Sequence, residues 1–205
     1  MDMDTQFPPG RPREFCTEAA LATALRLFWS RGYEGTSLSD LTKAIGVARP
    51  SLYAAFGNKE ALFRKVLDLY EREKLAYIGQ ALEAPTAREV AERLLRGAMQ
   101  SQTGQCEPHG CLEVINSVAC GPEAETVRAE VLKRGDTAKR AILDRLKRAQ
   151  AEGDLPDHVD AEGLTHFLAA VLQGMAVQAG AGASQAALAK LIETALAGWP
   201  DNRTG

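Results

Sequence analysis

Residues 49 to 59, RPSLYAAFGNK, hold several side chains that bond to phosphates and to base edges. A guanidinium can donate paired hydrogen bonds to guanine, and a hydroxyl can bond a base or a phosphate. A lysine beside the free N–H groups of a helix start could hold a phosphate. If these groups share one exposed face, the stretch can recognise double-stranded DNA. The candidate contacts here are Arg49, Pro50, Ser51, Tyr53 and Lys59.

Two short helices joined by a tight turn must position these side chains. Ser37 is a favourable N-cap, and Asp40 supplies the acidic half of a capping box before apolar residues recur at helical spacing. Gly46 ends this first helix, because a helix end commonly needs left-handed backbone that glycine adopts without steric cost. Pro50 then starts a second helix. The pattern predicts a helix-turn-helix whose second helix enters the major groove, although a packing corner in an all-helical protein would look similar.

The flanking residues support this helix pair. Residues 18 to 31 carry an apolar stripe and end at Gly32, which predicts a first helix that braces the two short ones. Asn58 can cap a following helix, so that Lys59 clamps a phosphate beside the recognition helix. Ahead of these helices, Arg11 and Arg13 lie in an extended tail that suits a narrow minor groove, and a disordered terminus fits that tail equally well.

The stretch GYEGTSLSDLTKAIGVARPSLYAAFGNKEALF, residues 32 to 63, resembles the N-terminal domain of the TetR/AcrR family of repressors. The Gly-Val turn, the Leu-Tyr pair and the Phe-x-Asn-Lys-Glu-x-Leu segment carry the resemblance, which covers about the first third of the chain. Ala48 departs from the pattern, since many relatives have a hydroxyl residue there. The resemblance implies a C-terminal ligand pocket coupled to the DNA-binding heads, and DNA contacts at Thr36, Ser37, Arg49, Ser51, Tyr53 and Lys59.

Length and composition fit a soluble globular protein. The chain has 205 residues, 45% of them hydrophobic and 25% charged, and its net charge is −3. A mild negative charge would be unusual for a protein that coats nucleic acid unspecifically but is compatible with a few basic contacts at one end. No apolar run approaches a membrane span or a secretory signal, so we expect a cytoplasmic protein with reduced thiols and no membrane partner.

Helical patterns separated by turn residues continue to the end of the chain, and no strand pattern or repeat interrupts them. We therefore expect an all-α fold of about nine helices, one of them running from Asn58 to about Ala84. The expected domain organisation is a flexible basic arm at 1–13, a helix-turn-helix domain at 14–57, and an effector-binding and dimerisation domain at 58–205.

The last two predicted helices, near 161–179 and 184–198, are apolar on more than one side. A helix with two apolar faces needs two partners, of which one is the core and the other is most simply the same surface of a second copy. We expect a homodimer, with burial inside one subunit as the alternative. The predicted interface residues are Ala170, Gly174, Val177, Leu188, Leu191, Ile192 and Ala195.

The middle helices offer a mostly apolar set of side chains with a few polar tips. A cavity lined by such residues would suit a small lipophilic or aromatic effector. Met and aromatic residues at helical spacing are also typical of plain core, and nothing in the residues identifies the effector. The candidate pocket residues are Tyr77, Met99, Gln102, Cys111, Val114, Ile115, Phe167, Val171, Met175 and Gln178.

The cluster Cys106-Glu-Pro-His109-Gly-Cys111, with Cys120 nine residues further on, could also carry chemistry. As metal-ligand spacing it is weak, and no metal site is predicted. A thiol switch between Cys111 and Cys120 is conceivable, since Cys111 opens a predicted short helix where N–H dipoles favour a thiolate, and inert core cysteines are the simpler interpretation.

Catalysis is the competing functional class. The chain has three histidines, and none belongs to a nucleophile elbow, zinc helix, phosphate loop or dinucleotide motif. We therefore predict no enzymatic activity and no cofactor. A ligand-binding helical protein without affinity for DNA remains an alternative if the helix-turn-helix is only a packing corner.

Overall fold

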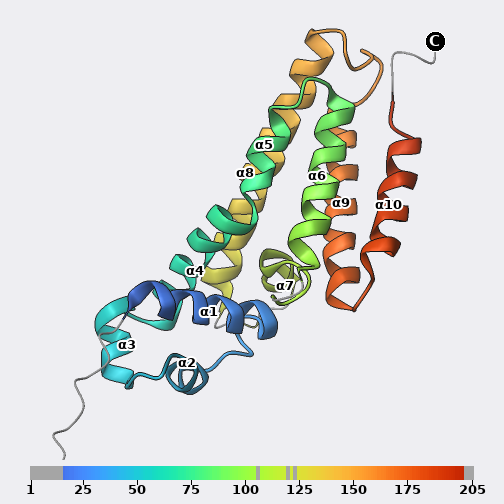
Figure 1. Ribbon diagram of the computed structural model, residues 1–205. Helices are drawn as coiled ribbons and strands as arrows, with labels where there is room; N and C mark the ends of the chain where they lie inside the picture. Colours follow the sequence, from blue (N-terminus) through green and yellow to red (C-terminus); the bar gives the residue numbers. More distant parts are fainter. Residues whose placement is uncertain (1–15, 105–106, 119–120, 122–123, 201–205) are drawn as a thin grey trace, which may run out of the picture.

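The computed structural model describes residues 16–104, 107–118, 121 and 124–200, and within these ranges the chain is entirely helical and turn. Helices α1 to α3 form a compact head at one end, and α5, α6, α8, α9 and α10 form an elongated bundle that extends away from it (Figure 1). The ten helices of the described ranges are α1 (Thr17–Arg31), α2 (Leu38–Ile45), α3 (Arg49–Phe56), α4 (Lys59–Lys74), α5 (Ala76–Leu82), α6 (Ala87–Gln102), α7 (Leu112–Val118), α8 (Glu125–Ala151), α9 (Ala161–Gly180) and α10 (Gln185–Ala197).

The head is held together by an apolar and aromatic core. The ring of Phe28 on α1 meets the ring of Phe63 on α4 edge to face, with centroids 5.0 Å apart. Trp29 meets Tyr70 in the same way at 5.0 Å. Leu41 from α2 and other apolar side chains of the short helices are buried against these rings. Since aromatic pairs of this geometry stabilise beyond their buried area, α1 and α4 form the rigid base on which α2 and α3 sit.

The chain between Asn58 and Ala84 forms two helices, which corrects the sequence expectation of a single helix. The helical ladder is interrupted at Leu75, and the hydroxyl of Ser101 on α6 donates a hydrogen bond of 3.0 Å to the freed carbonyl of Lys74. Gly97 on α6 then allows the ring of Tyr77 to approach so closely that a Cβ at that position would clash with it. No proline marks this break, because its cause is tertiary packing against α6.

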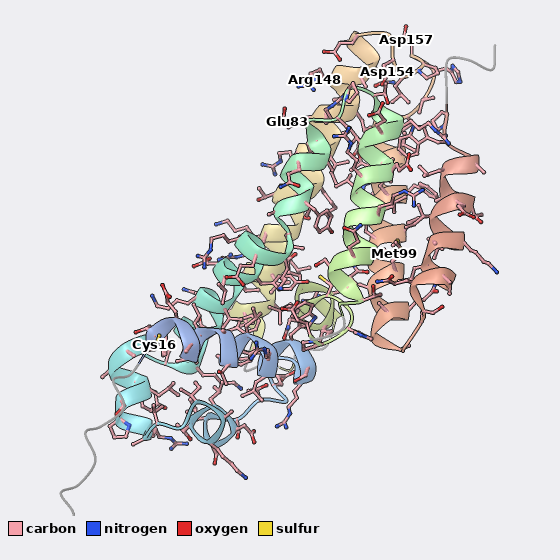
Figure 2. All side chains as sticks on the ribbon, in the orientation of Figure 1. Cys16, Glu83, Met99, Arg148, Asp154 and Asp157 are labelled. Atoms are coloured by element: carbon pink, nitrogen blue, oxygen red, sulfur yellow. The ribbon has the colours of Figure 1, made fainter. Side chains whose placement is uncertain are left out.

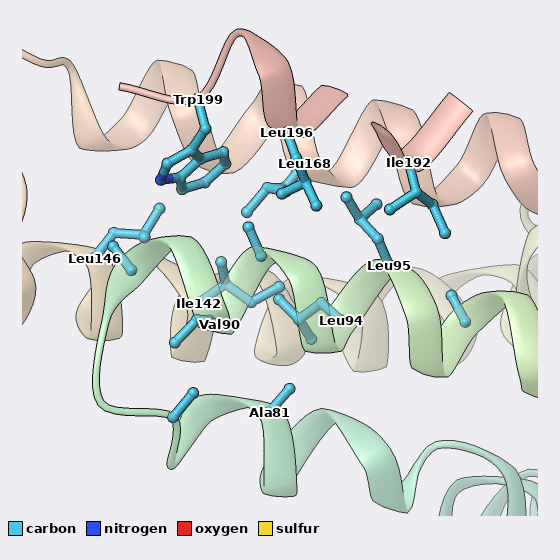
Figure 3. Packing of buried hydrophobic residues seen from close by; sticks show 14 of the residues in the cluster. Ala81, Val90, Leu94, Leu95, Ile142, Leu146, Leu168, Ile192, Leu196 and Trp199 are labelled. Carbon is cyan, nitrogen blue, oxygen red and sulfur yellow. The ribbon is translucent and has the colours of Figure 1, made fainter. Parts of the chain in front are cut away.

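The bundle has its own core, built mainly from α6, α9 and α10. Trp199, Leu196 and Ile192 point from the C-terminal segment toward Val90, Leu94 and Leu95 on α6 (Figure 3). Ile142 and Leu146 of α8 close the opposite side of the same cluster. Cys16 lies in the head at the start of α1, and Glu83 lies at the end of α5 away from the head (Figure 2).

The head and the bundle share one contact region rather than meeting at a linker. The core of the head includes Leu112 from α7, Val127 and Val131 from α8, and Ala176 from α9. Helix α4 belongs to the same core through Leu62 to Tyr70. The expected division between residues 57 and 58 therefore falls inside one continuous apolar cluster that also includes residues of α7, α8 and α9.

Candidate nucleic-acid interface and ligand cavity

Helix α2 and the turn after it have the local geometry that their sequence predicts. The backbone N–H of Asp40 donates to Oγ of Ser37 over 3.1 Å, and the backbone N–H of Ser37 donates to Oδ2 of Asp40 over 2.9 Å. The hydrogen bonds from Ser37 lower the pKa of Asp40 below its ordinary range. Gly46 ends the helix in the left-handed region with φ of 78°. This capping box and glycine turn set the angle between α2 and α3.

Helix α3 exposes the predicted contact residues together. Leu52 and Phe56 are buried beneath it, while Arg49, Pro50 and Ser51 are exposed. Tyr53 is 40% exposed on the same helix. Ala48 is the N-cap and provides no side-chain hydrogen bond, so the first N–H groups of α3 have no side-chain cap. A helix N-terminus of this kind, beginning with an arginine, suits the edge of a major groove.

Lys59 stands at the start of α4 beside the recognition helix. Its ammonium lies 4.2 Å from the centroid of the Tyr33 ring, and Tyr33 in turn packs edge to face on Phe63. Asn58 caps α4 by accepting a hydrogen bond of 2.7 Å from the N–H of Ala61. The cation is therefore pre-positioned by a ring at a helix N-terminus, an arrangement suited to a phosphate oxygen.

Two of the expected DNA contacts, Thr36 and Ser37, have side chains that already make hydrogen bonds within the head. Thr36 is completely buried, and its hydroxyl donates a 2.8 Å hydrogen bond to the carbonyl of Gly32. The expected DNA contact from the Thr36 side chain is therefore corrected to a structural role that fixes the α1–α2 turn. Ser37 is exposed, but its hydroxyl is engaged in the capping box. Arg11 and Arg13 lie outside the described residues.

The predicted dimer residues fall into two groups. Of the predicted residues on α9, Val177 is 62% exposed, and Ala170 and Gly174 lie on the same helix face. Phe167, which was expected in the effector pocket, is 44% exposed and extends this face. In contrast, Leu188 and Ile192 on α10 are fully buried against α6, so their expected role at a dimer interface is corrected to one in the subunit core. The α10 residues that are less deeply buried are Leu191 and Ala195.

A cavity of about 180 Å³ lies between α5, α6, α7, α8 and α9. It brings together Tyr77, Gln102, Cys111 and Val114 from the predicted pocket set. The other residues of the predicted pocket set do not line this cavity, so their assignment to the pocket is corrected. Phe167 and Gln178 are exposed, and Ile115 faces a separate hollow of about 590 Å³ beside Trp29. Those packed into the bundle core instead are Met99, Val171 and Met175.

Two polar groups in the wall of this cavity stand out. The amide oxygen of Gln102 is buried and accepts no hydrogen bond from the described residues. Burial raises the pKa of Glu113 to about 7, with repulsion by the Glu71 carboxylate adding to the shift and attraction by Arg134 opposing it. Both groups are acceptors in an apolar setting, where a missing partner is costly.

Cys111 borders the same cavity but is not set up as a thiolate. Burial is the largest influence and raises the pKa of its thiol, although a hydrogen bond with Tyr70 acts in the opposite direction. Burial therefore opposes the ionised sulfur that the start of α7 was expected to favour. Cys106 and Cys120 lie outside the described residues, so their distance from Cys111 stays unspecified.

Helix α7 connects the cavity with the head. The amide of Asn116 accepts a hydrogen bond of 2.8 Å from the backbone N–H of Tyr33. The indole N–H of Trp29 on α1 donates to the carbonyl of Gly110 just ahead of α7, over 3.2 Å. Glu113 and Val114 of this seven-residue helix line the cavity. One short helix is thus bonded to the DNA-binding head on one side and exposed to the cavity on the other.

Sequence reasoning missed several residues of this arrangement. Helix α8 contributes Val131, Gly135 and Ile142 to the cavity wall, and α7 contributes Glu113. A carboxylate inside the apolar run Leu112-Glu113-Val114-Ile115 was the one available signal, because an ionisable side chain on a short buried helix calls for a partner. Val131, Gly135 and Ile142 carried no signal, since small and aliphatic side chains on a long helix are ordinary packing residues.

Together, an exposed recognition helix on a three-helix head and an attached helical bundle define a helix-turn-helix DNA-binding protein. Models of known families agree with this class. Residues 20–66 match the family described as bacterial regulatory proteins, tetR family, and residues 87–195 match the tetracyclin repressor-like C-terminal domain. The chain belongs to the TetR family of bacterial transcriptional regulators.

Individual relatives are similar along nearly the whole chain. The transcriptional repressor ComR of Escherichia coli K12 is 36% identical over 194 residues, which cover 94% of this chain and 92% of ComR. The repressor BdcR of the same strain is 30% identical over 179 residues, covering 86% of this chain and 85% of BdcR. These identities support a DNA-binding regulator throughout, rather than a shared head alone.

A solved structure of the TetR family regulator CifR, in the form of a cysteine mutant described as complexed with 26-bp double-strand operator DNA, is similar to this chain. The TM-score is 0.87 at 41% identity, and the match covers 93% of this chain and 100% of the CifR chain. A regulator from Rhodococcus sp. RHA1 has 39% identity and a TM-score of 0.61, covering 90% of this chain and 99% of that one. Within the described residues no helix has both the length and the apolar character needed to cross a bilayer.

Proposed function

We propose that this protein is a ligand-responsive repressor that binds a palindromic operator as a homodimer and is released by a small, mostly apolar effector. The observation that carries the proposal is the position of α7, which is hydrogen-bonded to the head through Asn116 and Tyr33 and lines the cavity through Glu113. A ligand in the cavity must displace or stiffen α7, and the head is attached to it.

DNA recognition is assigned to α3 and the start of α4. Arg49 and Ser51 are exposed at the N-terminal end of α3, where side chains of a recognition helix reach base edges. Tyr53 and Lys59 are assigned to the sugar-phosphate backbone on either side. The CifR structure supports this assignment, because it is described as an operator complex of a chain with the same fold and 41% identity.

Dimerisation is assigned to the exposed face of α9. Phe167 and Val177 expose apolar surface at the two ends of this face, and the small residues Ala170 and Gly174 between them allow another helix to approach closely. A twofold axis at this face would place two heads side by side. Half-sites one helical turn of DNA apart, about 34–36 Å, would then make the operator a palindrome.

The regulatory step is a shift between two arrangements of the heads. The effector binds better to an arrangement in which the heads cannot span two half-sites, and it therefore lowers the affinity for the operator. The operator lowers the affinity for the effector by the same free energy. Coupling of about 1–3 kcal/mol, or about 5- to 150-fold in affinity, is the usual scale. The hydrogen bonds that join α7 to the head are the contacts through which this coupling acts.

Fluorescence anisotropy with labelled DNA from upstream of the protein's own gene tests the central claim. Wild-type protein should bind one segment with a steep salt dependence, and Arg49→Ala should lose the preference for that segment over unrelated DNA. Arg148→Ala is the matched control, because Arg148 lies at the end of the bundle far from the head (Figure 2). Equal binding by Arg49→Ala and wild type would overturn the proposal.

A further inference from the structure

The cavity wall is mostly apolar, and a few polar groups lie in it. Leu94, Val114 and Ile142 are among its aliphatic side chains. Its volume of about 180 Å³ is below the about 300–1,000 Å³ of pockets for drug-sized ligands, so the occupant is a small organic molecule. The polar groups of the wall must therefore determine which small molecules are accepted.

The amide oxygen of Gln102 is the first of these groups. Gln102 is 6% exposed, and its oxygen has no hydrogen-bond donor among the described residues. A buried acceptor without a donor is unfavourable, and a ligand that supplies a donor restores the missing hydrogen bond. Gln102 borders the cavity, so a donor brought by a ligand is the partner that its amide oxygen lacks among the described residues.

The carboxylate of Glu113 is the second group. Neither a hydrogen bond nor an ion pair of this carboxyl is found in the described part of the chain, although it lines the cavity. The nearby guanidinium of Arg134 is already paired with Asp68 at 2.9 Å, Glu71 at 3.0 Å and Glu130 at 2.9 Å. One cation faces three carboxylates there, so little positive charge remains for Glu113.

The lysine that borders the cavity, Lys139, is also paired. Nζ of Lys139 lies 2.7 Å from Oδ1 of Asp136, and both residues border the same cavity. The charge around Glu113 is therefore negative. An anionic ligand would be repelled by it and would find no unpaired cation among the described residues of the wall. Ligand carboxylates and phosphates are disfavoured, while a cation would gain the unpaired carboxylate of Glu113.

From these two acceptors in an apolar wall we infer that the cavity selects a small apolar amine. The amine is bound as its ammonium ion, with N–H groups donating to Glu113 and to Gln102. The inference deepens the proposed function, since it rests on this cavity being the effector site. An aliphatic or aromatic body fills the apolar part, and the charged end replaces the missing partners of both acceptors.

Calorimetric titration with three molecules of similar size tests this selection. The probes are 2-phenylethylamine, 2-phenylethanol and 3-phenylpropionate, added to the full-length protein at pH 8. Here an amine with a pKa near that of lysine, about 10.4, stays protonated and Glu113 is mostly ionised. We expect the amine to bind about ten- to a hundredfold more tightly than the alcohol, and the carboxylate to bind more weakly than both.

Two variants attribute the selectivity to the named groups. Glu113→Gln should bring the affinity for the amine down to within about threefold of that for the alcohol, and Gln102→Leu should weaken binding of both. Glu83→Gln is the matched control, since Glu83 is exposed at the far tip of α5 (Figure 2). Circular dichroism confirms that each variant is folded before titration.

The outcomes separate this inference from the proposed function. Preferred binding of the carboxylate, equal amine affinity in wild type and Glu113→Gln, or no binding of any probe would overturn the amine selection. Operator release is measured separately by anisotropy. If the amine binds through Glu113 and Gln102 yet operator affinity is unchanged, the selection stands and the ligand-responsive function is overturned.

Discussion

The backbone N–H of Tyr33 donates a 2.8 Å hydrogen bond to the side-chain oxygen of Asn116, a residue 83 positions further along the chain. Asn116 is 1% exposed, and its amide nitrogen donates to the carbonyl of Leu112 over 2.7 Å. This amide therefore fastens the end of α1 to α7 at the point where the head meets the ligand cavity. The oxygen and the nitrogen of this amide both make hydrogen bonds, which fixes the orientation of the side chain.

Asn116→Ala should lower the free energy of unfolding by about 1–3 kcal/mol, because the partly buried N–H of Tyr33 loses its acceptor. Urea denaturation followed by circular dichroism measures the change. Thr137→Ala is the control, since Thr137 is exposed and its hydroxyl bonds only within α8. A loss no greater than that of the control would show that the Tyr33–Asn116 contact carries no stability.

Lys59→Ala should weaken binding to all DNA sequences to a similar degree. A lysine that neutralises one phosphate contributes about one to the slope of log affinity against log salt concentration, so the variant should have a slope smaller by about 1. Anisotropy titrations at several salt concentrations measure it. An unchanged slope would place Lys59 away from the phosphates, whatever the effect on affinity.

Val177→Arg should convert the dimer to a monomer and reduce operator affinity. Val177 is 62% exposed on α9, so an arginine there does not disturb the subunit core, but two copies would place like charges across the proposed twofold axis. Sedimentation equilibrium gives the mass. Ala151→Arg, at an exposed site near the end of α8, should leave the mass unchanged. A dimeric Val177→Arg protein would refute the α9 interface.

The Glu113 carboxyl should make a contribution to stability that falls as pH rises from about 4.5 to about 7. Burial raises the pKa of this carboxyl to about 7 in the folded state, so between these values the folded protein holds a proton that the unfolded chain has lost. Higher pH therefore favours unfolding until Glu113 is ionised in both states. The charged groups facing it are Glu71 on α4 and Arg134 on α8, with the phenol of Tyr77 and the thiol of Cys111 close by.

Glu113→Gln should remove this contribution and make the protein about 2–3 kcal/mol more stable than wild type above pH 7. Urea denaturation at pH 5, 6, 7 and 8 measures the slope, with Glu83→Gln as the exposed control. Parallel pH profiles for wild type and Glu113→Gln would show that the carboxyl has its ordinary pKa in the folded protein.

The head could be predicted closely because its signals are local. A capping box spans four residues, Gly46 adopts positive φ, and Pro50 has no N–H to lose, so each acts before any tertiary contact forms. The exposed set on α3 followed from the same spacing. The burial of Thr36 did not follow, because its hydroxyl bonds the carbonyl of Gly32 in a turn whose shape depends on α1.

The sequence by itself determined that this chain is all-helical, with a helix-turn-helix of defined bounds and a resemblance to one family of DNA-binding regulators. Only the tertiary structure decided which apolar faces meet. In the folded protein Leu188 and Ile192 are buried against α6, and Val177 is exposed. A helix ends at Leu75, and Glu113 lines the cavity. The physical reason is that hydrophobic burial has no direction, so the apolar faces of a helix are equivalent until the packing of its neighbours distinguishes them.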